Sequence, residues 1–276
     1  MGAAEIERLL LRADDVLKAA ASRPQPGLAH EQVAVLLDRA RGHLDEVADL
    51  ERRRQLAGAI ARRVGDLDRA QLAPMLAPTP DVRRAPTTVD DPSRVPPGQR
   101  LTPGWPVLHV GAVPRIDPAD WRLVVTGRVR QRTVLGLEEL RALPTVTVTT
   151  DLHCVTGWSR LDNVWEGVRV RDVLTLAVPR VEASHVIVAG HPAYSANLPL
   201  ASLLDADVVL AWAHDGVPLP PAHGGPVRLV VPARYAWKSV KWVTELRLME
   251  RDVPGYWEER GYHDTADPWR EQRYRD

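Results

Sequence analysis

The 276-residue sequence contains no phenylalanine and a single cysteine, Cys154. One cysteine excludes an internal disulfide and an iron–sulfur cluster held by this chain alone. No heme-binding motif is present, and no run of about 18 apolar residues predicts a membrane-spanning helix. The formal net charge of +0 at pH 7 gives no general attraction to nucleic acid or to a membrane surface. The N-terminus also lacks a basic segment followed by an apolar core, so we expect a cytoplasmic protein.

Aromatic residues are missing from the first 104 positions, because all nine Trp and five Tyr lie at or after Trp105. Such a break in composition indicates a domain boundary. Nine prolines between Pro74 and Pro106 predict an extended linker, or a strap over the next domain, with little regular structure. We therefore expect a helical module at 1–77, a proline-rich linker at 78–104 and a second domain at 105–276.

The N-terminal module shows helical spacing of apolar residues at 3–21, at about 30–64 and, more briefly, at 67–76. Each stretch has one apolar face, which predicts an all-α helical hairpin or bundle. No set of catalytic residues occurs here. We interpret this part as an interaction module that forms a homodimer, docks a partner or packs on the second domain.

The sequence of the second domain shows a different pattern, with short strands separated by glycine and proline turns and a few single-turn helices. This pattern predicts an α+β domain of mixed sheets around one core. There is no GxGxxG motif and no P-loop. A turn is expected at Glu166-Gly167. The expected strands are 121–126, 145–151, 186–189, 207–213, 227–231 and 240–249, and the expected short helices are 137–140, 171–176 and 199–204.

Cys154 follows the alternating strand 145–151 and has polar and aromatic neighbours, including His153 and Trp158. Several readings stay open for it. A lone cysteine can be a small buried hydrophobe, but His, Asp and Thr are poor core neighbours. A nucleophile would need a base, although His153 should point to the opposite face of the strand. A zinc site lacks its usual ligand spacing. A thiolate could instead bind a redox metal whose other ligands come from a cofactor.

A second group of residues lies between positions 223 and 241. The chain has three lysines, and two of them, Lys238 and Lys241, are close together. Arg228 and Arg234 precede them, and a Gly-Gly-Pro turn after His223 brings backbone N–H groups to the surface. These features predict a site for a phosphate-bearing ligand. The alternative is a basic, solvated edge.

Ordered motifs along the second domain resemble the molybdopterin-binding oxidoreductase domain of the sulfite oxidase family, especially its soluble sulfite oxidase-like branch. The resemblance spans some 170 residues from about Trp105 and leaves out the first hundred. The motifs are Trp121-x-Leu-x-Val-x-Gly127, Leu137-x-x-Leu140-x-x-Leu-Pro144, Cys154-Val-x-x-Trp-Ser159, Trp165-x-Gly-Val168, Asn197-Leu-Pro-Leu200, Gly216-x-Pro-Leu219, His223-Gly-Gly-Pro-Val-Arg-Leu-Val-Val-Pro232, Lys238-Ser-Val-Lys-Trp242, Pro254-Gly-Tyr-Trp257 and Arg260-Gly-Tyr262.

This resemblance implies a mixed-sheet, sulfite oxidase-type molybdopterin-binding fold. It also implies a cofactor in which one molybdenum sits on a single pyranopterin and takes one protein thiolate, Cys154. A soft thiolate suits such a metal. The cofactor-binding positions that it implies are His109, Cys154, His223, Arg228, Lys238, Ser239, Val240 and Lys241.

Departures from the family pattern concern the substrate. Sulfite oxidases place arginines around the substrate anion, and two of those positions correspond here to Leu108 and Trp158. Their active-site tyrosine matches Trp212, and Tyr194 is either a pocket residue or a core tyrosine. A sulfite dianion would find fewer charged partners in such a site.

The departures predict an oxotransferase that reduces a small S-oxide or N-oxide and receives electrons from a separate protein or carrier. The residues expected to act on the substrate are Cys154, Trp158, Trp212 and Tyr194. The alternative is a catalytically degenerate domain, in which the protein acts as a binding or scaffold module through its helical N-terminus.

Overall fold

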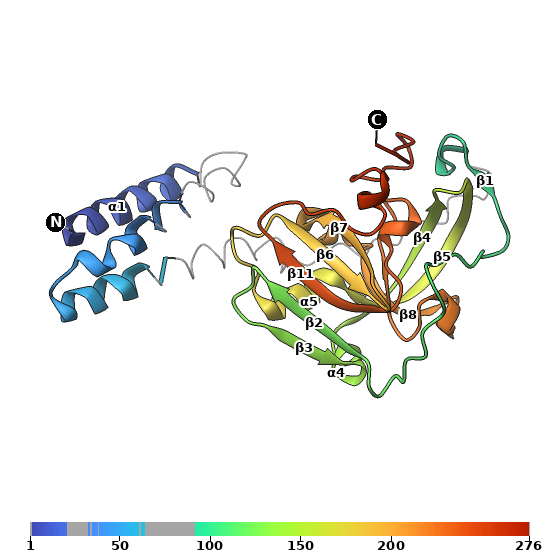
Figure 1. Ribbon diagram of the computed structural model, residues 1–276, viewed down its shortest axis with the longest axis horizontal. Helices are drawn as coiled ribbons and strands as arrows, with labels where there is room; N and C mark the ends of the chain where they lie inside the picture. Colours follow the sequence, from blue (N-terminus) through green and yellow to red (C-terminus); the bar gives the residue numbers. More distant parts are fainter. Residues whose placement is uncertain are drawn as a thin grey trace. The chain divides into compact units, whose positions relative to one another are not determined.

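The computed structural model describes residues 2–20, 33, 35–37, 39–60, 62–63 and 92–275 (Figure 1). The chain divides into two compact units. One comprises Met1–Pro74 with Arg180–Glu182, and the other comprises Met75–Pro179 with Ala183–Asp276. The third expected helix, at 67–76, and the linker residues 78–91 lie outside the described residues. Within the described part, no helix has both the length and the apolar character needed to cross a membrane.

The N-terminal unit is helical, with α1 at Gly2–Ala20 and further helical residues within 33–42 and 50–63. The prediction of one continuous helix from 30 to 64 is wrong, because residues 43–49 interrupt it. Asp49 explains the restart, since its Oδ1 accepts a hydrogen bond of 2.6 Å from the backbone N–H of Arg52. The core of this unit is Ile6, Leu9, Leu10, Ala13, Val33, Leu36, Leu37, Ala40, Val47, Leu56 and Ile60.

The second unit is built on two mixed sheets, which confirms the α+β prediction (Figure 1). Most strand pairs are antiparallel, but β1 runs parallel to β5 and β2 runs parallel to β11. The first sheet contains β1 (Arg100–Leu101), β4 (Thr145–Cys154), β5 (Trp158–Arg169), β8 (Val209–His214), β9 (Val217–Pro218) and β10 (Arg228–Val230). The second contains β2 (Arg122–Gly127), β3 (Thr133–Gly136), β6 (His185–Gly190), β7 (Tyr194–Pro199) and β11 (Val243–Met249).

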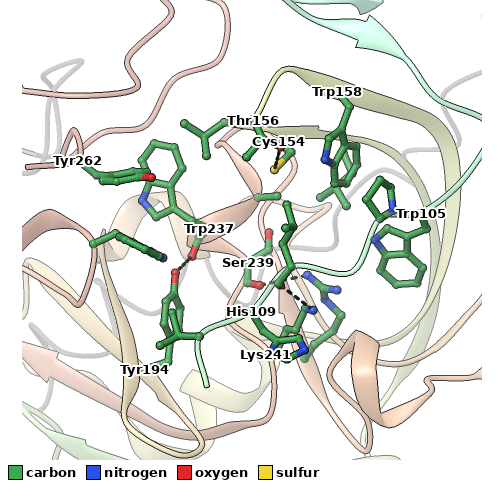
Figure 2. A pocket seen from close by; sticks show the side chains of 18 of the residues that line it. Trp105, His109, Cys154, Thr156, Trp158, Tyr194, Trp237, Ser239, Lys241 and Tyr262 are labelled. Carbon is green, nitrogen blue, oxygen red and sulfur yellow. Dashed lines mark hydrogen bonds between the residues drawn. The ribbon is translucent and has the colours of Figure 1, made fainter. Parts of the chain in front are cut away.

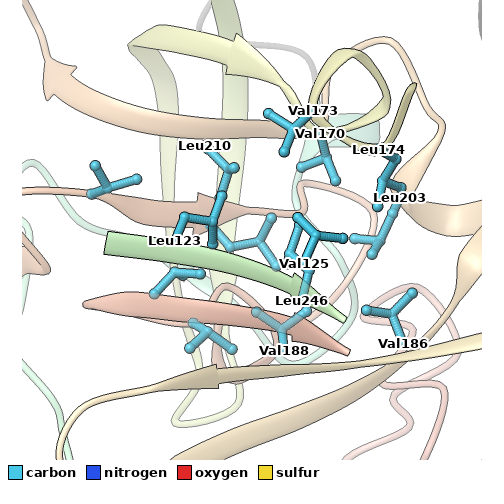
Figure 3. Packing of buried hydrophobic residues seen from close by; sticks show 14 of the residues in the cluster. Leu123, Val125, Val170, Val173, Leu174, Val186, Val188, Leu203, Leu210 and Leu246 are labelled. Carbon is cyan, nitrogen blue, oxygen red and sulfur yellow. The ribbon is translucent and has the colours of Figure 1, made fainter. Parts of the chain in front are cut away.

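Short helices complete this unit. The α-helices are α4 (Leu137–Arg141), α5 (Val170–Ala177) and α6 (Leu200–Leu203), and the 3₁₀ helices are η2 (Pro92–Arg94), η3 (Pro221–His223), η4 (Ala236–Lys238) and η5 (Glu258–Arg260). The main core joins both sheets to α5 (Figure 3). Leu123 of β2, Leu210 of β8 and Leu246 of β11 are all fully buried in it. Burial of such apolar side chains gives the sheets their common framework.

The expected turn at Glu166-Gly167 is wrong. Both residues lie inside the twelve-residue strand β5, and the register against β8 shifts between them. A β-bulge can occupy such a dipeptide without reversing the chain. Glycine is required here because a Cβ at position 167 would lie 2.1 Å from the carbonyl oxygen of Leu210. Strands β3, β5 and β7 were not among the predicted strands.

Part of the expected linker packs on the second unit as a strap over the β4–β5 hairpin. In β1, Arg100 pairs with Trp158 and Leu101 pairs with Ser159. Arg94 donates two hydrogen bonds, of 2.6 and 2.9 Å, to the carboxylate of Asp151. Such bidentate pairs fix orientation as well as distance. Residues 92–101 therefore hold the hairpin that carries Cys154.

The close approach at Gly167 leads to a stability prediction. We expect Gly167→Ala to lower the free energy of unfolding by roughly 1–3 kcal/mol, because the added methyl group forces β5 and β8 apart. Urea unfolding followed by circular dichroism measures this change. Gly104→Ala is the matched control, since the nearest atom to its new Cβ is 3.8 Å away. Equal unfolding midpoints for the two variants would contradict the prediction.

Candidate active site

A pocket of about 330 Å³ opens at the end of the β4–β5 hairpin. Its walls come from distant parts of the second unit: the segment 105–110, strand β7, the segment 236–242 and two C-terminal aromatic residues, Trp257 and Tyr262 (Figure 2). The predicted site residues that line it are His109, Cys154, Trp158, Tyr194, Arg228, Ser239 and Lys241. The fold thus brings together residues from positions 109 to 241.

Cys154 is the last residue of β4 and is buried. The hydroxyl of Thr156 donates a hydrogen bond of 3.2 Å to its Sγ, and the side-chain amide of Gln99 donates one of 3.1 Å to its carbonyl oxygen. The guanidinium of Arg273 binds the carbonyl oxygen of the next residue, Val155. The strap and the C-terminal segment therefore both fix the position of the thiol.

His153 does not share the pocket with Cys154. Its Nδ1 lies 2.8 Å from the Ser159 hydroxyl, and burial lowers the pKa of His153 to about 4. The neighbouring base that a cysteine nucleophile needs is thus directed elsewhere. Within the described part of the chain, no group of three or more His, Cys, Asp or Glu could hold a metal ion by itself. A metal at Cys154 would need most of its ligands from a cofactor.

Two cations border the pocket at the other side. Arg228 is 2% exposed, and its guanidinium donates to the carbonyl oxygens of His223 and Ser239 at 3.0 and 3.1 Å. The ammonium of Lys241 donates to the carbonyl oxygens of Leu108 and Ala222 at 3.0 and 2.8 Å. These hydrogen bonds all go to neutral acceptors. Two cations held in this way create a positive potential that an anion would relieve.

The pKa values of these two cations also indicate that the site favours an anion. Burial lowers the pKa of Arg228 to about 10. Burial, and then the charge of Arg228, lower the pKa of Lys241 to about 7. Both shifts mean that burial in the protein disfavours the charged forms. A bound anion would favour those forms again, so the pair is suited to a phosphate.

His223 lies behind the lining residues rather than among them. Its ring stacks on Trp105 with centroids 3.8 Å apart, and the guanidinium of Arg228 lies 5.4 Å from the Trp105 ring. Its Nδ1 is buried without a hydrogen-bond partner in the described structure. Burial, followed by the charges of Lys241 and Arg228, lowers the pKa of His223 to about 4. The imidazole therefore has an unused polar atom beside the two cations.

Lys238 is not exposed to the pocket, in contrast to the sequence-based interpretation. It is fully buried in η4, and its Nζ lies 2.6 Å from Glu258 Oε1 and donates to Asn197 Oδ1 at 2.6 Å. Burial lowers the pKa of Lys238, and the charge of Glu258 opposes that shift. The indole N–H of Trp237 donates to the same Glu258 oxygen at 2.9 Å. Lys238 thus anchors the C-terminal aromatic segment.

Two further predicted site residues and one basic residue also lie away from the pocket lining. Val240 is part of the main core. Trp212 lies in β8, and its indole N–H donates a hydrogen bond of 2.8 Å to Glu166 Oε1. The guanidinium of Arg141 lies 5.6 Å from the centre of the Trp212 ring. Arg234 donates to the Ser202 hydroxyl at 3.3 Å. The fold therefore gives Trp212 a polar partner outside the pocket.

Aromatic side chains make up much of the remaining wall. Tyr194 lines the pocket, and its hydroxyl donates a hydrogen bond of 2.6 Å to the carbonyl oxygen of Trp237. Burial raises the pKa of Tyr194. Sequence reasoning did not assign the other aromatic residues of the wall, which are Trp105, Trp237, Trp242, Trp257 and Tyr262. A signal for them existed, because Trp237 and Trp242 flank the two lysines of the basic segment.

Comparisons with known proteins point to one family. The family model described as oxidoreductase molybdopterin binding domain matches residues 110–257. The uncharacterized oxidoreductase YuiH of Bacillus subtilis is 45% identical over 186 residues, which cover 67% of this chain and 94% of that protein. A putative protein-methionine-sulfoxide reductase subunit, YedZ1, of Azospira oryzae is 32% identical, covering 55% of this chain and 57% of the relative. Mitochondrial sulfite oxidase of Drosophila melanogaster is 33% identical over a region that covers 54% of this chain and 31% of that protein.

The buried Lys238–Glu258 pair gives the second prediction. We expect Lys238→Met to lower the free energy of unfolding by about 3–5 kcal/mol, because it leaves the Glu258 carboxylate buried without its cation. Adding Glu258→Leu should recover most of this loss. The exposed pair Arg128–Glu250, with 53% and 51% exposed side chains, is the control. Arg128→Met should cost no more than about 1 kcal/mol in the same urea titration. Similar losses for Lys238→Met and Arg128→Met would refute the assignment.

Proposed function

The chain belongs to the family of oxidoreductases with a molybdopterin-binding domain, and we propose that its reaction is oxygen-atom transfer that reduces an S-oxide or an N-oxide. The observation that carries this proposal is the division of the pocket. A thiol stands on one side, two cations with neutral acceptors border another, and uncharged aromatic side chains form much of the rest.

The residues present fit a molybdenum-pyranopterin cofactor. Arg228 and Lys241 would bind its anionic phosphate end, and half-buried His223, whose buried Nδ1 has no partner in the described structure, lies near both cations. His109 and Ser239 border the same side of the pocket. The Cys154 thiolate would be the protein ligand of the metal. Such a cofactor supplies the two-electron exchange of an oxygen atom, and this chain's residues supply its orientation.

The substrate side of the pocket favours an uncharged oxide over an oxyanion. Once Arg228 and Lys241 face a phosphate, the side chains left near Cys154 are uncharged, among them Trp158 and Tyr194. A sulfite dianion would then lose its hydration without gaining a charged partner. A neutral oxide with apolar substituents can instead pack against the indole and phenol rings. The printed name of the Azospira relative, a sulfoxide reductase subunit, agrees with this class.

The electrons for this reduction would come from a separate protein or a small carrier. The chain has one cysteine and therefore cannot hold an iron–sulfur cluster alone. The helical N-terminal unit, which has a hydrophobic core of its own, is the proposed docking module for that partner or for a homodimer.

The test is to purify the protein from a host that makes molybdopterin. We expect molybdenum and pterin in equal amounts, and turnover of methionine sulfoxide or trimethylamine N-oxide with reduced viologen. Bound zinc without molybdenum or pterin would refute the cofactor, and efficient sulfite oxidation would refute the substrate class. A loaded protein that turns over no oxide would favour the binding-module alternative. Cys154→Ser is the control, and it should retain pterin while turnover disappears.

The cation pair gives a separate prediction. We expect Lys241→Met to weaken cofactor retention roughly tenfold or more, because a charge-assisted contact to phosphate is lost. The readout is the pterin content that remains after gel filtration. Arg234→Met is the matched control, because it removes a cation from the same segment that does not line the pocket. Equal pterin loss in both variants would contradict a role for Lys241 in phosphate binding.

A further inference from the structure

The indole nitrogen of Trp158 is buried and has no hydrogen-bond partner in the described structure. All nine tryptophans lie in the described part of the chain, and each of the five others that are buried donates to an acceptor. The paired donors are Trp121 to Val243 O, Trp165 to Thr150 Oγ1, Trp212 to Glu166 Oε1, Trp237 to Glu258 Oε1 and Trp242 to Pro221 O. Trp158 is thus an exception that needs a cause.

The position of this N–H points to a ligand. Trp158 is 8% exposed, lines the pocket and is the cross-strand partner of Cys154 in the β4–β5 pairing. In Figure 2 its indole lies beside Cys154, with the nitrogen on the edge nearer to the sulfur. A buried donor without an acceptor is unfavourable, and native structures normally supply an acceptor. Trp158 lines the pocket beside Cys154, so a ligand held there is a candidate for the missing acceptor.

Backbone hydrogen bonds hold the chain at Trp158 in place. Arg100 of β1 pairs with Trp158, and its backbone N–H donates 3.0 Å to the carbonyl oxygen of Gly157. The N–H of Gly157 donates 3.0 Å to the carbonyl oxygen of Cys154 and closes the turn. The strap thus limits how far Trp158 can move to find a protein acceptor. The backbone that carries this donor is therefore fixed next to the thiol.

The neighbouring neutral donors are already in use. The hydroxyl of Thr156 donates to Cys154 Sγ, and the hydroxyl of Tyr194 donates to the carbonyl oxygen of Trp237. An indole N–H can only donate, so its partner must be an acceptor. An oxide has such an oxygen, whereas the thioether or amine formed from it does not.

We propose that the Trp158 indole N–H donates a hydrogen bond to an oxygen atom held beside Cys154. This inference rests on the proposed function. The acceptor is either the oxygen of the oxide substrate or an oxygen of the cofactor, and both have the same chemistry. If it is the substrate's oxygen, Trp158 distinguishes the oxide from its deoxygenated product, because a site with an unpaired donor binds the product less well.

The direct test is the indole N–H resonance of Trp158 in the loaded, dithionite-reduced protein labelled with ¹⁵N-tryptophan. Trp158→Phe assigns this resonance by its disappearance. The probe is dimethyl sulfone, which carries S=O oxygens and does not turn over, and dimethyl sulfide is its oxygen-free counterpart. We expect the Trp158 proton to move downfield and its exchange with solvent to slow when an acceptor arrives.

The arms of this experiment separate the two sources of oxygen. A downfield shift on cofactor loading alone assigns the acceptor to the cofactor. A shift that needs dimethyl sulfone, and that dimethyl sulfide does not produce, assigns it to the substrate. An unchanged resonance in both arms overturns the inference, provided that metal and pterin analysis shows a loaded protein. Absence of metal and pterin would instead refute the proposed function.

A matched pair of variants gives an independent readout. If the substrate's oxygen is the acceptor, Trp158→Phe should raise KM for the oxide roughly tenfold, because it removes one hydrogen bond and keeps an aromatic ring. Trp257→Phe also changes an aromatic wall residue, but the Trp257 nitrogen is not among the buried unpartnered atoms. It should alter KM much less. Equal changes in the two variants, with dimethyl sulfone affinity also equal, would overturn a donor role toward the substrate.

Discussion

The antiparallel pairing of β4 with β5 sets the position of the candidate active site. β5 is also bonded to β1 and β8, so the hairpin is fixed to the sheet along its length. Its end carries Cys154 and Trp158 as cross-strand partners. Because side chains alternate along a strand, a slip by one residue would turn the thiol away from the pocket. The bulge at Gly167 and the strap at 92–101 therefore matter for the site, although both lie outside it.

The basic residues near the site divide into two electrostatic classes. Lys238 is neutralised by Glu258 in the interior, where the pair ties η4 to η5. Arg228 and Lys241 are held by carbonyl oxygens, and their pKa values are lowered. A buried ion pair contributes mainly by fixing the geometry around it. A pair of like charges contributes affinity for an anion. Lys238 and Lys241, three positions apart in sequence, thus have opposite electrostatic surroundings, which their residue type alone does not reveal.

Particular residues show which features of the fold and the site could be predicted from the sequence and which could not. Apolar patterning located β2, β4, β6, β8 and β11. Alternation marks a strand with one buried face, such as β2, and a continuous apolar run marks a strand buried on both faces, such as β8. It missed β7 and took the Glu166-Gly167 bulge for a turn, since both features depend on the neighbouring strand. Ordered motifs brought Cys154, Arg228 and Lys241 to one site. They could not tell the buried pair of Lys238 from a phosphate contact, and they assigned Trp212 to the site although Glu166 holds its indole elsewhere. Burial and tertiary partners decide such cases.

Because the chain has no phenylalanine, every aromatic ring of the pocket wall carries a polar atom. The chain has no phenylalanine anywhere, so its aromatic walls are built from tryptophan and tyrosine, which carry a polar atom. Several of those atoms are paired, as in Trp237, Trp242 and Tyr194. A phenyl ring at position 158 would fill similar space without leaving a buried donor, whose desolvation costs about 1–3 kcal/mol. Tryptophan at this position therefore costs stability that a phenyl ring would not cost. An acceptor on a bound ligand would remove that penalty, and this is the physical basis of the role proposed for Trp158.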